Sequence, residues 1–308
     1  MNTVGITTID TGFVRPYFAA SHLLIENNHV AFIDVGTTHS VPRLLEVLRA
    51  KNIPVTNVDY VIVTHVHLDH AGGAGKLMQA LPNAKLVVHP RGAYHLINPN
   101  KLITSAISVY GAEIFQANYG KIIPVAAERV IQAENEQILN LQGRPLLFLD
   151  TPGHAKHHFC VFDIRSKSFF TGDTFGISYR EFDTDKGKFI YAATTPTQFE
   201  PLLLHKSINR LLSYHPTKMY LTHYGEVNEV TELADKLHDS IDKQVEIIKS
   251  VAEHNTNYHD QLVNSLFDYF LAELQDLGCT IPISTCRKLL QMDVELNAQG
   301  LTTWWEQL

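Results

Sequence analysis

The chain has 308 residues, of which 45% are hydrophobic and 19% are charged. This composition is typical of a globular protein and excludes a mainly disordered chain. Lysine and arginine total 25 against 32 aspartate and glutamate residues, so the formal charge is −7. Because there is no basic surplus to bind a phosphate backbone, we expect no nucleic-acid partner.

Cysteine content and hydropathy indicate where the protein works. Three cysteines are too few for a disulfide framework, which favours a reducing environment. The chain has no run of about 18 apolar residues, so we expect no membrane association. Residues 1–10 lack the basic start and apolar run of a signal peptide. A cytoplasmic location is therefore predicted.

The first part of the chain alternates β-like runs with turns and amphipathic segments. Two of the runs are separated by Asn27 and Asn28, which predicts a hairpin. Ser40 precedes leucines at helical spacing and is a residue type that favours helix N-caps. The predicted elements here are strands at 21–26, 30–35, 59–64 and 85–89, and helices at 41–50 and 72–81.

The remainder of the chain predicts a mixed body followed by a helical extension. Residues 91–124 have helical spacing and are interpreted as an insertion. Further predicted elements are strands at 146–149, 159–164, 168–171 and 219–222, and a helix at 199–214. After Gly225 only helical periodicity is apparent, and no further strand is expected. We predict a catalytic domain at residues 1–226 and a C-terminal helical cap or extension at 227–308.

Four potential metal ligands lie within six positions, directly after the buried strand at 59–64. They are His65, His67, Asp69 and His70, and a glycine pair follows them. Imidazole nitrogen and carboxylate oxygen suit Zn²⁺, iron and Mn²⁺. So short a segment cannot place all four ligands around one ion without strain. The first two could face one ion while the last two face another.

Three more ligand types follow predicted strands in the same way. His154, Asp173 and His223 each come after an apolar run and a small or turn residue. Residues at the same end of neighbouring strands converge, so we expect these side chains to meet the His65–His70 cluster.

The order of these residues resembles the metallo-β-lactamase superfamily, whose signature is H-x-H-x-D-H followed by a distant His, an Asp and a last His. All seven positions are filled, and the resemblance covers about residues 15–225. It implies an α+β fold, a four-layer αβ/βα sandwich with a dinuclear site at one edge between the two sheets. It also implies the ligand sets: His65, His67 and His154 for the first ion, Asp69, His70 and His223 for the second, and Asp173 as the bridge.

Two cations a few ångströms apart stabilise a bridging hydroxide near neutral pH, and that hydroxide attacks a carbonyl or phosphoryl centre. The chain is therefore predicted to be a metal-dependent hydrolase with two divalent ions, zinc being favoured over iron and manganese. Asp69 would orient the nucleophile and pass a proton to the leaving group. A small-molecule substrate is expected, with thioesters favoured, then lactones, other esters or a phosphodiester.

Alternatives of other classes remain open at this point. The same ligand set can hold iron for redox, oxygen-binding or persulfide dioxygenase chemistry, and a regulatory protein with residual hydrolase activity is a third reading. The C-terminal helices could roof the site or form a homodimer interface.

Several neighbours of these ligands are weaker candidates. Asp34 precedes a glycine and could orient a metal ligand. Tyr179, Tyr191 and Tyr224 could border the pocket and donate a hydrogen bond to a developing oxyanion. His157 and His158 are interpreted as structural residues rather than site residues.

Overall fold

The computed structural model describes residues 5–194, 196–253 and 257–308. The chain forms two compact units. Within the described ranges, unit 1 comprises residues up to 150, 157–172 and 215–228, and unit 2 comprises residues 151–156, 173–214 and 229–308. The predicted domain boundary after residue 226 lies near the point at which the chain leaves unit 1 for the last time, and it stays a prediction.

Unit 1 contains two six-stranded mixed sheets. The first has the order β1-β2-β3-β4-β5-β6, with β3 to β6 parallel to one another and β1 and β2 antiparallel to their neighbours. Its strands are β1 (Ile6–Asp10), β2 (Ala20–Glu26), β3 (His29–Ile33), β4 (Val58–Ile62), β5 (Lys85–Val88) and β6 (Val130–Gln132).

The second sheet has the order β12-β11-β10-β9-β8-β7, and its only parallel pair is β10 with β11. Its strands are β7 (Ile138–Leu141), β8 (Arg144–Asp150), β9 (Phe159–Asp163), β10 (Ser168–Gly172), β11 (Lys218–Leu221) and β12 (Gly225–Val227). The chain enters unit 2 between β8 and β9 and again directly after β10.

The helices divide between the units. Unit 1 has α1 (Val41–Ala50), α2 (Leu68–Ala71), α3 (Ala74–Ala80), α4 (Pro90–Ile97), α5 (Asn100–Tyr110) and α6 (Ala112–Tyr119). Unit 2 has α7 (Pro201–Leu212), α8 (Val230–Ala252), α9 (His259–Asp276) and α10 (Ile283–Trp305). Single 3₁₀ turns lie at Val55–Asn57, Ala127–Arg129 and Arg180–Phe182. No described helix has the length and apolar character needed to cross a bilayer.

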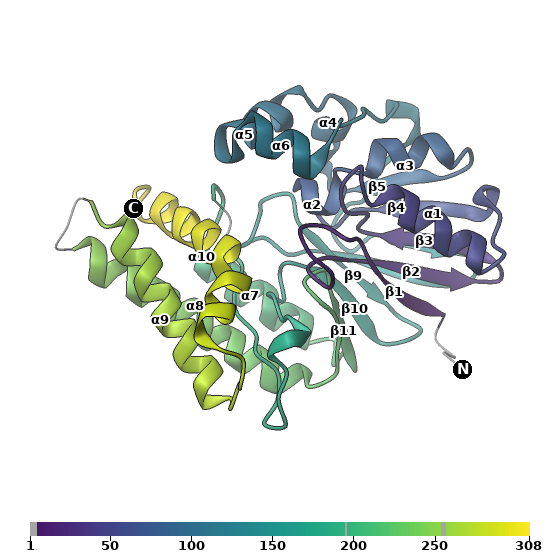
Figure 1. Ribbon diagram of the computed structural model, residues 1–308. Helices are drawn as coiled ribbons and strands as arrows, with labels where there is room; N and C mark the ends of the chain where they lie inside the picture. Colours follow the sequence, from purple (N-terminus) through teal and green to yellow (C-terminus); the bar gives the residue numbers. More distant parts are fainter. Residues whose placement is uncertain (1–4, 195, 254–256) are drawn as a thin grey trace. The chain divides into compact units, whose positions relative to one another are not determined.

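Period-2 alternation in the strands builds the core of unit 1. One face of the first sheet, with Leu24 and Ile62, packs against Phe148 and Phe170 of the second sheet. The other face packs against apolar residues of α1 and α3, which Figure 1 shows lying together over that sheet. Burying both faces of the first sheet leaves the loops at its strand ends as the place where polar side chains can gather.

The structure confirms the predicted strands and helices, with ends that shift by a few residues, and the helical segment at 91–124 corresponds to α4, α5 and α6. The prediction that no strand follows Gly225 is wrong, because Gly225–Val227 pairs antiparallel with β11. Ser40 is at the N-cap of α1, but its hydroxyl accepts from the backbone of Thr37 rather than capping the helix.

Candidate metal centre

The cluster at residues 65–70 lies where β4 passes into α2. His65 and His67 are in the segment before the helix, and α2 begins at Leu68. Asp69 and His70 are therefore on its first turn. The turn that follows requires glycine: a Cβ at Gly72 would lie 2.4 Å from the carbonyl oxygen of Leu68. Tight backbone packing here holds the cluster at the sheet edge.

Three of the predicted ligands converge within unit 1. His223 follows β11, and its Nε2 lies 3.2 Å from Oδ2 of Asp69. Nε2 of His70 lies 3.6 Å from the same oxygen. Ligand atoms of the three residues lie within 4.8 Å of one another. Ligands about 2.1 Å from a tetrahedral ion are about 3.4 Å apart, so the donor types and their spacing fit a divalent cation.

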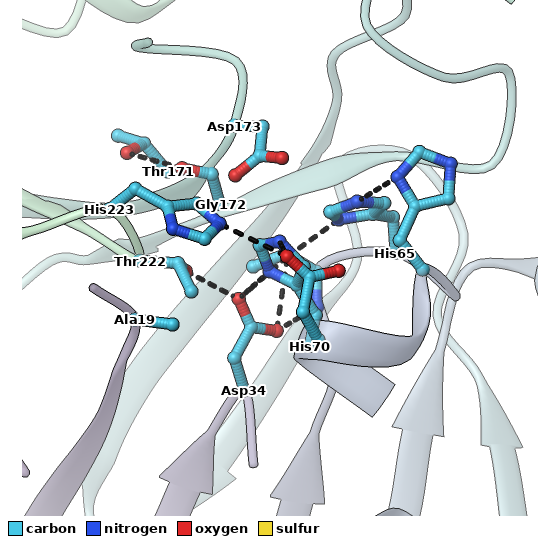
Figure 2. A network of polar contacts seen from close by, with 12 residues as sticks. Ala19, Asp34, His65, His70, Thr171, Gly172, Asp173, Thr222 and His223 are labelled. Atoms are coloured by element: carbon cyan, nitrogen blue, oxygen red, sulfur yellow. Dashed lines mark hydrogen bonds and ion pairs between the residues drawn. The ribbon is translucent and has the colours of Figure 1, made fainter. Parts of the chain in front are cut away.

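A hydrogen bond from His70 to the carboxylate of Asp34 holds the His70 ring in place. Its carboxylate is fully buried and accepts from Nδ1 of His70 at 2.8 Å and from the Thr222 hydroxyl at 2.6 Å. It also accepts from the backbone N–H of Thr64 at 2.8 Å and from the Thr64 hydroxyl. Figure 2 shows Asp34 at the centre of this network. With Nδ1 donating, Nε2 of His70 is the nitrogen available to a metal.

His223 is oriented in the same way by the backbone. Its Nδ1 lies 2.8 Å from the carbonyl oxygen of Phe18, in the loop between β1 and β2. An N–H donated to this carbonyl fixes the tautomer and turns Nε2 toward Asp69. Both imidazoles of the Asp69–His70–His223 cluster are therefore positioned as ligands before any ion binds.

His65 and His67 form a second imidazole group in unit 1. Nε2 of His65 lies 2.8 Å from Nδ1 of His67, and the His65 ring is fully buried. The ring of His158 stacks on His65, with centroids 4.8 Å apart. A Cβ at Gly172 would lie 2.6 Å from Nε2 of His158, so a glycine is required there. The interpretation of His158 as a structural residue stays a prediction, and its stacking on His65 was not foreseen from the sequence.

His154 and Asp173 lie in unit 2. Nε2 of His154 is 3.2 Å from Oδ2 of Asp173, and both side chains are buried. Nδ1 of His154 is 2.9 Å from the carbonyl oxygen of Ala193. This again leaves Nε2 for a metal. Asp173 directly follows Gly172, the last residue of β10. The predicted first-ion and bridging ligand sets draw on both units and stay predictions.

Comparison with known proteins identifies the family. A model of the metallo-β-lactamase superfamily matches residues 14–223. The chain belongs to this superfamily. A metallo-β-lactamase fold-containing protein, ST1585 of Sulfurisphaera tokodaii, is 26% identical over 228 residues, which cover 73% of this chain and 80% of the relative. A probable metallo-hydrolase of Bacillus subtilis, YqjP, is 22% identical over 316 aligned positions, covering 92% and 89%.

Solved structures show the same fold. The crystal structure of ST1585 has a TM-score of 0.69 at 22% identity and covers 97% of this chain and 98% of its own. TTHA1429 of Thermus thermophilus has a TM-score of 0.68 at 16% identity, covering 98% and 93%. The predicted metallo-β-lactamase fold is thereby confirmed, and the chain carries the His and Asp cluster able to hold metal ions.

For each of the three tyrosines predicted to border the site of this metallo-β-lactamase-fold protein, the structure shows a contact with a residue that is not a predicted metal ligand. The Tyr179 hydroxyl donates to Asp293 of α10 at 3.1 Å. Tyr191 packs on Phe270 of α9, with ring centroids 4.7 Å apart. Tyr224 contacts another aromatic ring, that of Tyr17, at 5.3 Å. Their roles as pocket residues stay predictions.

A series of aromatic rings in unit 1 begins at the Asp69–His70–His223 cluster, and sequence reasoning missed it. The Phe18 ring lies 5.4 Å from that of His223, and Phe13 lies 5.6 Å from both Phe18 and Tyr119. Tyr119 in turn lies 5.6 Å from Tyr110. Burial raises the pKa of Tyr110 to about 12, and the Asp69 carboxylate adds to this shift. The two tyrosines are neutral hydroxyl donors within the field of Asp69.

Proposed function

We propose that this superfamily member is a dinuclear metal-dependent hydrolase acting on a small ester-type substrate, with thioesters favoured. One observation carries the proposal. Each of three predicted ligand imidazoles has its Nδ1 held by an acceptor, His70 by Asp34, His223 by Phe18 and His154 by Ala193. Neutral imidazoles oriented in this way are typical of metal centres, since the acceptor sets both tautomer and basicity.

Two bound divalent ions would supply a water-derived nucleophile at neutral pH and polarise the substrate carbonyl. Asp69 is the residue that would accept and return the proton during hydrolysis. Its Oδ2 faces His70 and His223, and its side chain is 22% exposed, so the carboxylate lies at the boundary between the cluster and solvent. A carboxylate in this position accepts a hydrogen bond from the attacking water and returns a proton to the leaving group. A thiolate leaving group needs little such help, which suits a single carboxylate.

The neighbours of the cluster favour an acyl substrate. The aromatic series from Phe18 to Tyr110 makes the surroundings of His223 apolar, with Phe13, Phe18 and Tyr119 themselves buried. Tyr17, in the same loop as Phe18, is 55% exposed and available to a ligand. The guanidinium of Arg15 lies 5.4 Å from the Phe18 ring centroid. Aromatic rings with one cation suit an apolar acyl group attached to an anionic carrier.

A matched substrate panel tests this proposal. The same acyl group is offered as a thioester, an oxygen ester and a lactone, and an aryl phosphodiester is added, all with protein purified without chelator. We expect metal-dependent hydrolysis with the highest kcat/KM for the thioester. Asp69→Asn should lower kcat/KM by about 10²-fold or more. Asp268→Asn, at an exposed aspartate of α9, is the control and should leave it unchanged.

Other outcomes decide against parts of the proposal. Preference for the phosphodiester would overturn the acyl assignment while keeping the hydrolase. Iron in the protein together with oxygen consumption, and no hydrolysis of any of the four compounds, would replace the hydrolase with the redox alternative.

A further inference from the structure

Four polar side chains of unit 2 face one another where α7 packs against α8, and none of them is among the ligands described above. His205 and Asn209 are on α7, and His238 and Asp242 are on α8. Each pair is spaced by four residues, which places its members on one face of their helix.

The two imidazoles are in close contact. Their rings stack with centroids 4.8 Å apart and 15° between planes, and their Nδ1 atoms are 2.6 Å apart. The outer nitrogens have oxygen neighbours: Nε2 of His205 lies 3.1 Å from Oδ1 of Asp242, and Nε2 of His238 lies 3.2 Å from Oδ1 of Asn209.

These neighbours restrict the tautomers. A carboxylate only accepts, so the proton of His205 is on Nε2 and its Nδ1 presents a lone pair. If Nε2 of His238 donates to the Asn209 carbonyl, its Nδ1 also presents a lone pair. A separation of 2.6 Å is that of a hydrogen bond, so one proton must lie between the two nitrogens, and a metal ion can take the place of that proton.

We propose that His205 and His238 bind a divalent transition-metal ion such as Zn²⁺ through their Nδ1 atoms. Each ring then has the outer acceptor typical of a ligating histidine, Asp242 for one and Asn209 for the other. A tetrahedral Zn²⁺ needs the two nitrogens about 3.4 Å apart, so the rings must separate by less than 1 Å. The His205 side chain is 22% exposed, which leaves room for this shift and for solvent ligands.

The surrounding charges favour a cation at neutral pH. Asp235, Asp239 and Asp242 are the charged neighbours of the His238 ring, besides His205. Burial is the largest cause that lowers the pKa of His238 below its ordinary value. The ring is therefore neutral near pH 7 and able to bind a metal.

Zinc stoichiometry tests this site independently of the proposed hydrolase function. Wild-type protein, His205→Gln, His238→Gln and the double variant are dialysed against the same buffered free zinc. We expect each variant to hold one zinc per chain fewer than wild type. His259→Gln is the matched control, because His259 is half-exposed in the same unit and also lies beside a carboxylate. It should hold as much zinc as wild type.

A second measurement on the unaltered protein guards against a folding defect in the variants. In ¹⁵N spectra of the imidazoles, zinc should shift the Nδ1 signals of His205 and His238 together. Equal zinc content in wild type and the double variant, or unmoved Nδ1 signals at saturating zinc, would overturn the proposal.

Discussion

Asp34→Asn is the substitution that most sharply tests how the Asp69–His70–His223 cluster is built. Asp34 has a φ of +49°, a conformation that asparagine tolerates well, so the change affects hydrogen bonding rather than the backbone. The carboxylate accepts on both oxygens, from the Thr64 backbone on Oδ1 and from His70 on Oδ2. An amide offers only one accepting oxygen and places an NH₂ group at the other position.

Either orientation of the new amide has a cost. With NH₂ toward His70, the imidazole must accept on Nδ1 and carry its proton on Nε2, the nitrogen that faces Asp69. Metal affinity of the cluster should then fall about 10- to 100-fold. With NH₂ toward Thr64, a buried backbone N–H faces another donor, at a cost of about 1–3 kcal/mol in the free energy of unfolding.

Competition titration with a chelator measures the affinity, and urea denaturation measures the free energy. Asp59→Asn is the control, because Asp59 also bonds a histidine, His29 at 2.8 Å, which is not a predicted ligand, and both side chains are partly exposed. Wild-type affinity combined with wild-type stability in Asp34→Asn would refute the role assigned to Asp34.

Three further predictions concern charge and burial. Arg15→Gln should raise KM about 10-fold for a thioester with an anionic carrier and leave an uncharged thioester unaffected; equal KM changes in steady-state assays would contradict the assigned contact. The pKa of His22 is lowered to about 4, mainly by burial, so the folded state favours the neutral ring. Stability from this group is complete above about pH 6.5 and is lost as the pH falls toward 4, by up to about 3 kcal/mol. Urea denaturation of chelator-treated protein at pH 7 and 4.5 should show a smaller pH effect in His22→Gln, and an equal effect would refute it. Arg144→Met should destabilise by about 3–5 kcal/mol, because it leaves the buried Asp163 carboxylate without its cation, and Asp163→Leu added to it should restore part of the loss; a cost below about 1 kcal/mol in urea denaturation would contradict this.

The long, strongly patterned elements were predictable from the sequence. Helix α1 has the bounds that its leucine spacing indicated, and the strands that precede the predicted ligands were all recognised. The strands that were missed are β1, β6, β7 and β12, of three to five residues each. A run of three or four partly exposed residues, such as Val130–Gln132, is too short for its hydrophobic periodicity to indicate a strand. Such a strand is defined only by its pairing with a neighbouring strand.

The candidate ligands were predictable because they cluster after strands, and Asp34 was named as a residue that could orient one of them, but the partners of these orienting groups were not predictable. Asp34 meets its partners His70 and Thr222 from 36 and 188 residues away. The Tyr179 hydroxyl bonds to a residue 114 positions along the chain. Contacts over such separations depend on sheet order and loop packing, which hydrophobic periodicity does not encode.

Metal content tests the central claim most directly. Protein purified without chelator, tag or added metal, and then dialysed against metal-free buffer, should retain two divalent ions per chain besides any ion held by His205 and His238, which the double variant His205→Gln/His238→Gln subtracts. Asp69→Asn should retain at most one ion, and Asp268→Asn should retain both. Folded wild-type protein that holds no metal, and does not regain it when zinc, iron or manganese is supplied, would contradict the assignment of these histidines and aspartates as a metal centre.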